Sequence, residues 1–349
     1  MNRIEKETLE LERLHPAASR SAESAGRSFE EIPDEWRTRY ERDRDRIIHC
    51  SAFRRLMYKT QVFVNHVGDN QRTRLTHSLE VLQVSRSLAS ALNLNEPLCE
   101  AIALAHDLGH PPYGHSGEVL LNEKMAAHGG FAHNRQSLRI VNLLEQRSPE
   151  YRGLNLTLET QDCLKKHEKV FDPASGTQLR FPRLEGQLVD LADSTAYHYH
   201  DVDDGIREGI LDPVQMRTEL PLWEMAVAAA QKRHPEEAHG TLLWRRAANE
   251  LLGLAIADVR EESARRLLAT AARSAVAAQS CEQRLLGHSE SFGSMVAGLH
   301  AYLYANMYLK EEVNWHVRRA TELLGKVFDA LLQRPERVPE QFLQNAESP

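Results

Sequence analysis

Three histidines and two carboxylates lie within residues 106–118, which read HDLGHPPYGHSGE. The apolar run at residues 101–105 leads into them, and the two prolines end any helix there, because proline lacks an N–H donor and clashes with the preceding turn. Burying so many ionisable groups costs free energy unless they bind a metal or pair with one another. The segment therefore predicts a metal or acid–base site; the alternative is a polar surface turn whose histidines are incidental.

Two predicted helices carry further side chains that could bind a metal. In the helix expected from about residue 74 to 92, apolar residues recur on two faces, which is typical of a helix inside a bundle and puts His77 in the interior. Another helix is expected over about residues 184–201. Along one of its faces, and just beyond it, acidic and aromatic residues recur every three or four positions: Asp190, Asp193, Tyr197, Asp201 and Asp204. Apolar residues are interleaved with them, so a solvated acidic stripe fits this helix poorly.

The elements that position these residues predict an all-α fold. The chain has 349 residues, enough for a sizeable core, and Leu, Ala, Glu and Arg abound. The best strand candidate is residues 60–67, and a helix is expected to begin near residue 117. We expect a partly mobile arm at residues 1–36, a helical core with the site at 37–207, and a helical region at 208–349 packed on that core. The clearest helices of the last region are expected at 242–259, 264–278, 292–308 and 313–332.

Charge and composition exclude several classes of protein. The formal net charge of −7 disfavours a general nucleic-acid binder. Residues 37–74 are locally basic, which suits either a compact polyanion such as a triphosphate or a solvated helix with alternating charges. No apolar run approaches the ~20 residues that span a membrane, and the four cysteines show no CxxC spacing. These features predict a cytoplasmic protein with reduced thiols and no membrane partner.

The order His77, then His106 with Asp107, then Asp193 resembles the H…HD…D signature of the HD superfamily of metal-dependent phosphohydrolases. The segments DRDRIIHCSAFRRL from residue 43, KTQVF from residue 59, RLTHSLEV from residue 74 and HNRQSLRI from residue 133 resemble the bacterial dGTPases, and more closely the shorter dGTPase-like proteins. The likeness is strongest over residues 43–207. It implies an HD-domain helical bundle with a C-terminal helical extension.

The resemblance also implies a role for each candidate residue. The expected ligands of a divalent metal are His77, His106, Asp107 and Asp193, a mixed nitrogen and oxygen set that suits Mn²⁺, Mg²⁺ or another first-row ion. Such an ion acidifies a bound water and polarises a phosphoryl oxygen. His115 with Glu118 would be the acid–base pair, which either protonates the leaving 5′-oxygen or orients the attacking water. The remaining positions align with phosphate contacts (Arg74, His110 and His133) and with deoxyribose contacts (Gln61, Tyr197 and Asp201).

The function that this likeness implies is metal-dependent hydrolysis of dGTP or several dNTPs to a deoxynucleoside and inorganic triphosphate. Two alternatives remain open. One is an HD phosphohydrolase that acts on a nucleoside monophosphate, a cyclic nucleotide or a guanosine polyphosphate. The other is a non-catalytic protein that binds nucleotides or single-stranded nucleic acid. The family likeness further implies a homo-oligomer, a hexamer in many relatives, and leaves open a dNTP activator.

Overall fold

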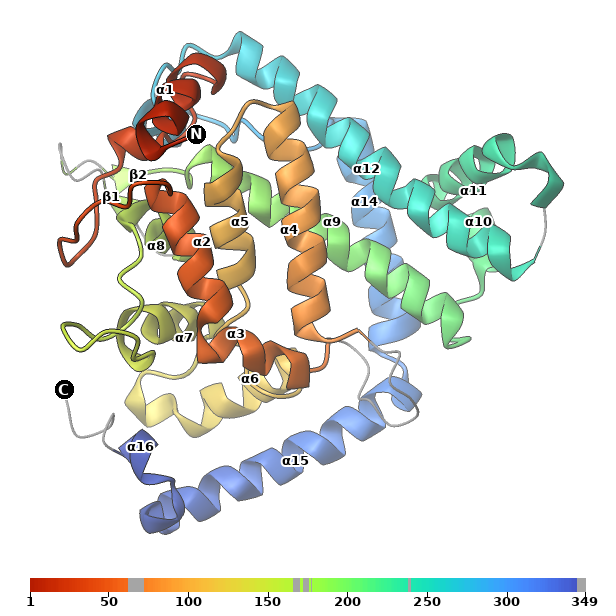
Figure 1. Ribbon diagram of the computed structural model, residues 1–349. Coiled ribbons are helices and arrows are strands. Elements are labelled where there is room, and N and C mark those ends of the chain that lie inside the picture. Colours follow the sequence, from red (N-terminus) through yellow and green to blue (C-terminus); the bar gives the residue numbers. More distant parts are fainter. Residues whose placement is uncertain (62–71, 166–169, 172–175, 177, 238–239, 344–349) are drawn as a thin grey trace.

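The computed structural model describes residues 1–349 except 62–71, 166–169, 172–175, 177, 238–239 and 344–349. Helices dominate the structure (Figure 1), and among the described residues the regular strands are limited to the antiparallel pair β1 (Val170–Phe171) and β2 (Gln178–Leu179). The prediction of an all-α fold is confirmed. The strand expected at residues 60–67 lies mostly outside the described residues, and its first residue, Thr60, forms a single bridge with Thr73.

Four helices build the centre of the molecule: α2 (Arg39–His49), α4 (Arg74–Ala91), α5 (Glu96–Ala105) and α9 (Leu184–Arg207). Helix α5 packs against the other three, and every residue of it from Leu98 onward is buried. Asn95 caps this helix by accepting the N–H of Leu98, which satisfies one of the donors left free in a first helical turn. Because α5 ends directly before His106, it delivers the His106–Asp107 pair into the interior.

Helices α4 and α9 lie side by side across this centre (Figure 1). On α4 the predicted interior position of His77 is confirmed, since the residue is only 1% exposed. Helix α9 begins at Leu184 as expected but continues past residue 201 to Arg207. Its first half packs with α4 and α5 in one hydrophobic cluster, and Val202 in its second half packs with α11, α12 and α14 in another. The helix that carries Asp193 therefore joins the core to the C-terminal region.

The described part of the C-terminal region is mostly helical. Its helices are α10 (Pro213–Glu219), α11 (Pro221–Arg233), α12 (Thr241–Ala269), α13 (Ala275–Gln279), α14 (Glu290–Leu303), α15 (Glu311–Gln333) and α16 (Glu340–Leu343). The expectation of separate helices at 242–259 and 264–278 is wrong, because α12 is continuous to residue 269. Residues 260–263 contain no Gly or Pro that would break it, and Val259, Ser263 and Leu267 are all buried along its inner face.

In Figure 1 the shorter helices α3 (Ser51–Arg55), α6 (Gly114–Lys124) and α7 (His133–Arg139) lie at the lower part of the core, and α8 (Leu158–Leu164) lies higher on its left side. A π turn at residues 140–144 extends α7, and another at 304–308 extends α14. Helix α15 lies along α6 at the bottom of Figure 1, where Lys124 Nζ contacts the carboxylate of Asp329 at 2.7 Å and Gly325 packs on Leu120. The C-terminal region thus also covers the helix that carries Glu118.

The N-terminal segment, for which composition predicts a partly mobile arm, makes defined contacts with the core. After α1 (Arg3–Arg13), Ala17 and Ala18 enter the hydrophobic core, because two small side chains fit there. Ser19 donates hydrogen bonds from its backbone N–H and its hydroxyl to Glu185, both at 2.9 Å. Arg27 forms an ion pair with the buried carboxylate of Asp43. This segment is therefore fastened to the core, while the bounds of the three expected regions stay a prediction.

None of the described helices combines the length and the apolar character needed to cross a bilayer. No disulfide joins the four cysteines, all of which lie within the described residues.

Candidate metal centre and its surroundings

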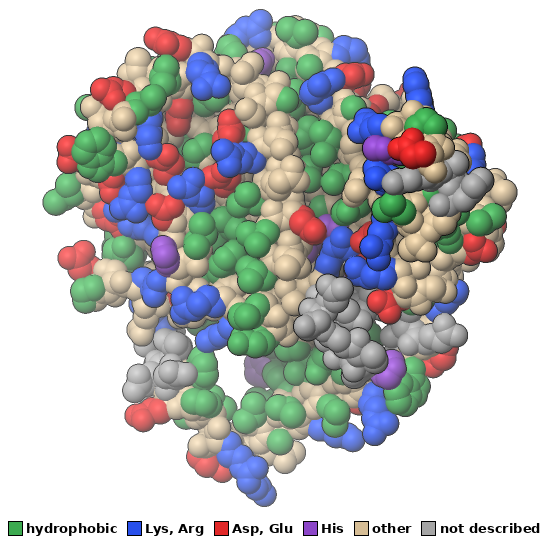
Figure 2. Space-filling model, turned by 45° about the vertical axis from the view of Figure 1, so that its right-hand side comes forward, with side chains coloured by type: hydrophobic (Ala, Val, Ile, Leu, Met, Phe, Trp, Pro, Cys, Tyr) green, Lys and Arg blue, Asp and Glu red, His purple; other side chains and the backbone are tan. Residues whose placement is uncertain are grey.

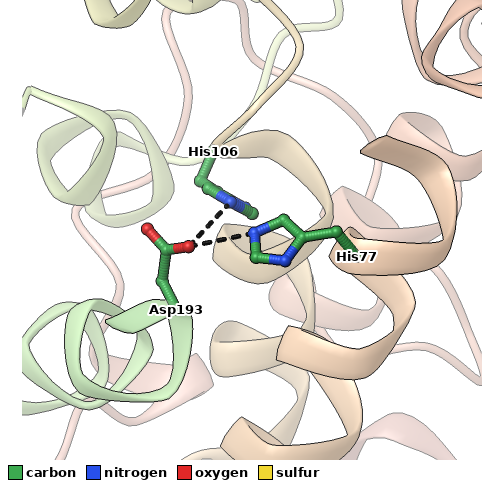
Figure 3. A group of neighbouring side chains, drawn as sticks. All are labelled: His77, His106 and Asp193. Carbon is green, nitrogen blue, oxygen red and sulfur yellow. Dashed lines mark hydrogen bonds and ion pairs between the residues drawn. The ribbon is translucent and has the colours of Figure 1, made fainter. Parts of the chain in front are cut away.

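Three of the four expected metal ligands meet where α4, α5 and α9 come together (Figure 3). The side chain of His77 comes from α4, that of His106 from the end of α5, and that of Asp193 from α9. Oδ1 of Asp193 lies 3.0 Å from Nε2 of His77 and 3.6 Å from Nε2 of His106. Two imidazole nitrogens and a carboxylate oxygen within 4.8 Å of one another are a donor set that can hold a divalent ion.

The environment of His106 fits a metal ligand. Its Nδ1 lies 2.6 Å from the carbonyl oxygen of Ala103, so Nδ1 carries the proton and donates it to that carbonyl. The other ring nitrogen, Nε2, then holds a lone pair, and it is buried without a hydrogen-bond partner. A buried, unpaired acceptor costs free energy unless a bound group satisfies it, and metal-binding histidines commonly donate their second N–H to a carbonyl in this way.

Asp107 stands beside these three residues and links them to a second group. Its Oδ1 lies 3.3 Å from Nε2 of His106 and 3.2 Å from Nε2 of His110, while Oδ2 accepts a hydrogen bond from Arg74 at 2.7 Å. Burial raises the pKa of Asp107, but the neighbouring His106, Arg74 and His110 outweigh it and lower the pKa well below its usual range. The carboxylate is therefore ionised, with one oxygen facing the metal centre, as its predicted role as fourth ligand requires.

Without an ion, His77 and Asp193 form a hydrogen bond with each other. Burial lowers the pKa of His77, but the hydrogen bond and the charge of Asp193 outweigh it, so the pKa is raised. Nε2 of His77 and Oδ1 of Asp193, which face each other here, are also the atoms that would bind a divalent ion. Metal binding would therefore displace the proton that His77 otherwise shares with Asp193.

The second group consists of His110, Glu118 and His133. The rings of His110 and His133 stack with their centroids 3.9 Å apart. Glu118 accepts hydrogen bonds from Nδ1 of His133 at 2.8 Å and from its backbone N–H at 2.7 Å. Partial burial raises the pKa of Glu118, but these bonds outweigh it and lower the pKa to about 2; burial lowers the pKa of His110 to about 4. At neutral pH the group therefore holds an ionised carboxylate beside a neutral His110.

His115 occupies a different place from the one expected. A helix start near residue 117 would put His115 in a loop, but α6 begins at Gly114 and His115 lies in its first turn. Tyr113 and Gly114 adopt left-handed backbone angles, with φ of 63° and 55°, which reverse the chain directly after the prolines. Nδ1 of His115 lies 3.5 Å from Oε2 of Glu118, and the side chain is 87% exposed. The expected pair is thus adjacent. The imidazole of His115 is open to solvent, and the carboxylate of Glu118 is fixed by hydrogen bonds from His133.

Comparison with known proteins agrees with this arrangement. The HD domain family matches residues 74–198, and the phosphohydrolase-associated domain matches residues 286–349. A deoxyguanosinetriphosphate triphosphohydrolase-like protein of Deinococcus radiodurans is 45% identical over 342 residues, covering 97% of this chain and 89% of its own. Proteins of the same description from Ralstonia nicotianae and Geobacter metallireducens are 43% and 38% identical, covering 94% and 99% of this chain and 86% and 90% of their own. The chain belongs to the dGTPase-like family of HD-domain proteins.

Two of the three residues expected at the phosphates contact the candidate ligand Asp107. Arg74 is buried against Asp107, and its Nη2 approaches Gly114 so closely that an added Cβ there would stand 3.0 Å away. His110 and His133 form the stacked pair described above. Gln61, expected at the sugar, has a buried Oε1 without a hydrogen-bond partner. Arg74 and His110 therefore lie beside the candidate ligand Asp107, and the backbone carbonyl of Gln61 lies near Gly114.

Two of the three residues expected at the sugar, Tyr197 and Asp201, lie further along α9. The rings of Tyr197 and Tyr308 have their centroids 6.0 Å apart, and Tyr308 donates a hydrogen bond to Asp201. Tyr308 was not among the expected site residues, because it comes from the π turn after α14 and only the fold brings it here. Lys59 was also missed as a site residue: burial and the nearby Arg74 lower its pKa to about 8, and its Nζ donates to the carbonyl of Leu108.

Apart from Arg74, five of the ten arginines and lysines at residues 37–74 pair with carboxylates. Arg37 pairs with Asp34 and Asp45, Arg44 with Glu100, Arg42 and Arg46 with Glu31, and Arg72 with Asp203 and Asp204. On the left half of the face in Figure 2, basic and acidic side chains are likewise interspersed. These arginines therefore stabilise the core and its N-terminal segment, whereas Arg74 and Lys59 are the basic residues of the stretch that approach the site.

Proposed function

We propose that this chain is a metal-dependent dNTP triphosphohydrolase, which cleaves dGTP or several dNTPs to a deoxynucleoside and inorganic triphosphate. The observation that carries the proposal is the orphaned, buried Nε2 of His106 facing Asp193, with His77 and Asp107 beside it. The described donors fit a divalent ion, Mn²⁺ or Mg²⁺, held by these four residues. When bound, such an ion supplies Lewis acidity to a phosphoryl oxygen and acidifies a water molecule.

The residues around the centre support a division of labour along the substrate. Arg74, His110 and His133 would bind the triphosphate, and Arg74 is already fixed in place by Asp107. His115 would either protonate the leaving 5′-oxygen or orient the attacking water, with its Nδ1 facing the ionised carboxylate of Glu118. Gln61, Tyr197 and Asp201 would contact the deoxyribose. The presence of residues expected at a triphosphate together with residues expected at a sugar supports a nucleoside triphosphate over a smaller phosphate ester.

A turnover screen tests this proposal. Purified protein is incubated with each of the four dNTPs, the four NTPs, a nucleoside monophosphate, a cyclic nucleotide and a guanosine polyphosphate, with Mn²⁺ or Mg²⁺. We expect hydrolysis of at least one dNTP, with dGTP the first to examine because the relatives carry its name. Turnover of only the monophosphate, cyclic or polyphosphate substrates would favour another HD phosphohydrolase activity. Metal binding without turnover of any nucleotide would favour a non-catalytic binding protein.

Two further parts of the proposal concern partners. We propose a homo-oligomer of six copies, and a dNTP activator that raises turnover of a second dNTP. Light scattering should give about six times the chain mass of 39.7 kDa, whereas a monomer would contradict the assembly. Turnover of each dNTP alone and in mixtures tests the activator, which equal rates in both cases would exclude.

A further inference from the structure

Two residues, the buried His200 and the half-exposed Glu80, lie behind the candidate ligand His77. Its Nδ1 lies 3.4 Å from Nδ1 of His200, and the other nitrogen of His200, Nε2, forms an ion-pair contact with the carboxylate of Glu80. Both histidines are 1% exposed, and their rings are inclined at 81° to each other. From the metal centre outward the order of groups is therefore Asp193, His77, His200 and Glu80.

Each of the two helices at this point supplies one residue of the centre and one residue behind it. Helix α4 carries His77 and, one turn later, Glu80. Helix α9 carries Asp193 and, two turns later, His200. Successive members of the row therefore come alternately from α9 and α4. The distance between the two helices thus affects the orientation of the His77 ring.

Arg72 fixes the outer end of the row. Its Nε lies 3.6 Å from Glu80, and its guanidinium also pairs with Asp203 and Asp204 at the end of α9. Glu80 is thus the half-exposed end of the row, with a side chain 39% exposed. The guanidinium of Arg72 holds it, and the acids at the end of α9 hold Arg72.

The positions of the protons in the row follow from the role of His77. A histidine that binds a metal through Nε2 keeps its proton on Nδ1. That Nδ1–H of His77 points at Nδ1 of His200, which must be bare to accept it, so His200 carries its own proton on Nε2. The Nε2 that carries this proton makes an ion-pair contact with the carboxylate of Glu80. If His200 carried its proton on Nδ1 instead, that N–H would face the N–H of His77, and the bare Nε2 would face the carboxylate of Glu80. Both contacts would then be repulsive.

We propose that His200 and Glu80 are positioning residues that hold His77 with Nε2 bare and aimed at the metal centre, and thereby set how tightly the protein binds its divalent ion. The inference rests on the metal site of the proposed function and is independent of the substrate. Partners of metal-binding histidines typically contribute ~10–100-fold in metal affinity. The carboxylate of Glu80 selects the tautomer of His200, and His200 passes that selection to His77.

Titration of the metal-free protein with Mn²⁺ tests the proposal without any turnover. Glu80→Gln keeps the size of the side chain and should raise the Kd for Mn²⁺ about 10-fold, and His200→Ala about 100-fold. Glu208→Gln is the matched control, because Glu208 is an exposed acid at the end of α9 outside the row, and its Kd should equal that of the natural chain. If His200→Ala does not fold, Glu80→Gln alone decides.

A spectroscopic signature separates positioning from general structural support. In protein with ¹⁵N-labelled histidines, the His200 signals, assigned by their loss in His200→Ala or His200→Gln, should show the proton on Nε2 both without metal and with Mg²⁺. A proton on Nδ1 of His200, or unchanged Mn²⁺ affinity in both variants, would overturn the inference. If Asp193→Ala does not weaken Mn²⁺ binding, the metal site is wrong and the inference falls with it. Lack of turnover on dNTPs would count against the proposed function alone.

Discussion

Tyr308 donates its hydroxyl hydrogen to the carboxylate of Asp201, and this bond ties the π turn after α14 to the helix that supplies Asp193. Asp201 is 1% exposed, and burial raises its pKa to about 7 although hydrogen bonds from Tyr308 and Tyr197 oppose the shift. The C-terminal region therefore does more than cover the core. It completes the group of side chains that we expect to contact the sugar.

The ring of Tyr197 is predicted to exclude ribonucleotides. Tyr197 lies one helical turn beyond Asp193, so we expect it to face the part of the substrate next to the reacting phosphate. Removing the ring in Tyr197→Ala should leave space for a 2′-hydroxyl and narrow the preference for dNTP over NTP in kcat/KM by about 10-fold or more. Tyr308→Phe keeps both rings and serves as the control, which should retain the preference. Unaltered discrimination in Tyr197→Ala would mean that Tyr197 only fills the core.

Asp193 is predicted to be indispensable for metal binding. Asp193→Ala removes the oxygen that faces both imidazoles, so the purified variant should contain no divalent metal by elemental analysis and should show no turnover. Ser194→Ala is the control, because its hydroxyl bonds within α9 to the carbonyl of Asp190. Full metal occupancy in Asp193→Ala would reject the assignment, and a loss of only ~10–100-fold in affinity would place Asp193 behind the ligands rather than among them.

His115 is predicted to act in proton transfer and not in metal binding. Its exposed ring lies beside Glu118 and away from the three-residue cluster, so His115→Ala should keep the metal but lose ~10²–10⁴-fold in kcat. The neighbouring exposed residue gives the control variant Ser116→Ala, which should keep its activity. Equal kcat in His115→Ala and the natural chain would show that the histidine is structural.

Glu31 is predicted to make the stability of the N-terminal segment depend on pH. Partial burial raises its pKa, but hydrogen bonds from Arg46, Tyr151 and Asn155 outweigh it and lower the pKa from 4.5 to about 2. The unfolded chain therefore binds this proton more tightly than the fold does. The ionised group stabilises the fold fully above about pH 4.5, and this contribution is lost as the pH falls towards about 2.

The measurement compares thermal unfolding of the natural chain and Glu31→Gln at neutral pH and near pH 3. The difference in Tm between them should shrink at the lower pH, where the natural chain begins to lose the same charge. Glu30→Gln, which changes the exposed neighbouring acid, should show a smaller difference at both values. A Tm gap for Glu31→Gln that is the same at both pH values would contradict the role of the charge.

Local sequence patterns were sufficient for the helices that carry the metal centre. The cap at Asn95, the two apolar faces around His77 and the acidic spacing that includes Asp193 are all set within one or two helical turns, and the structure contains each of these helices. The three ligands could be grouped only by resemblance, because nothing in their spacing shows that three separate helices meet.

Other features depended on geometry that the sequence does not display. The start of α6 follows from the left-handed backbone of Tyr113, which few residues other than glycine and asparagine adopt and which no propensity predicts. Tyr308 reaches Asp201 across 107 residues of chain. His200 lies in a segment that was recognised, but its contact with His77 depends on the packing of α9 against α4.

The products of the reaction show directly whether a dNTP is cleaved to deoxynucleoside and inorganic triphosphate. Protein with Mn²⁺ or Mg²⁺ is given the dNTP that it hydrolyses fastest, and the products are separated by ion chromatography and identified by ³¹P NMR. We expect one equivalent each of deoxynucleoside and intact inorganic triphosphate, and both amounts should fall to background in Asp193→Ala. Deoxynucleoside monophosphate with pyrophosphate, deoxynucleoside diphosphate with phosphate, or equal products from Asp193→Ala would contradict it.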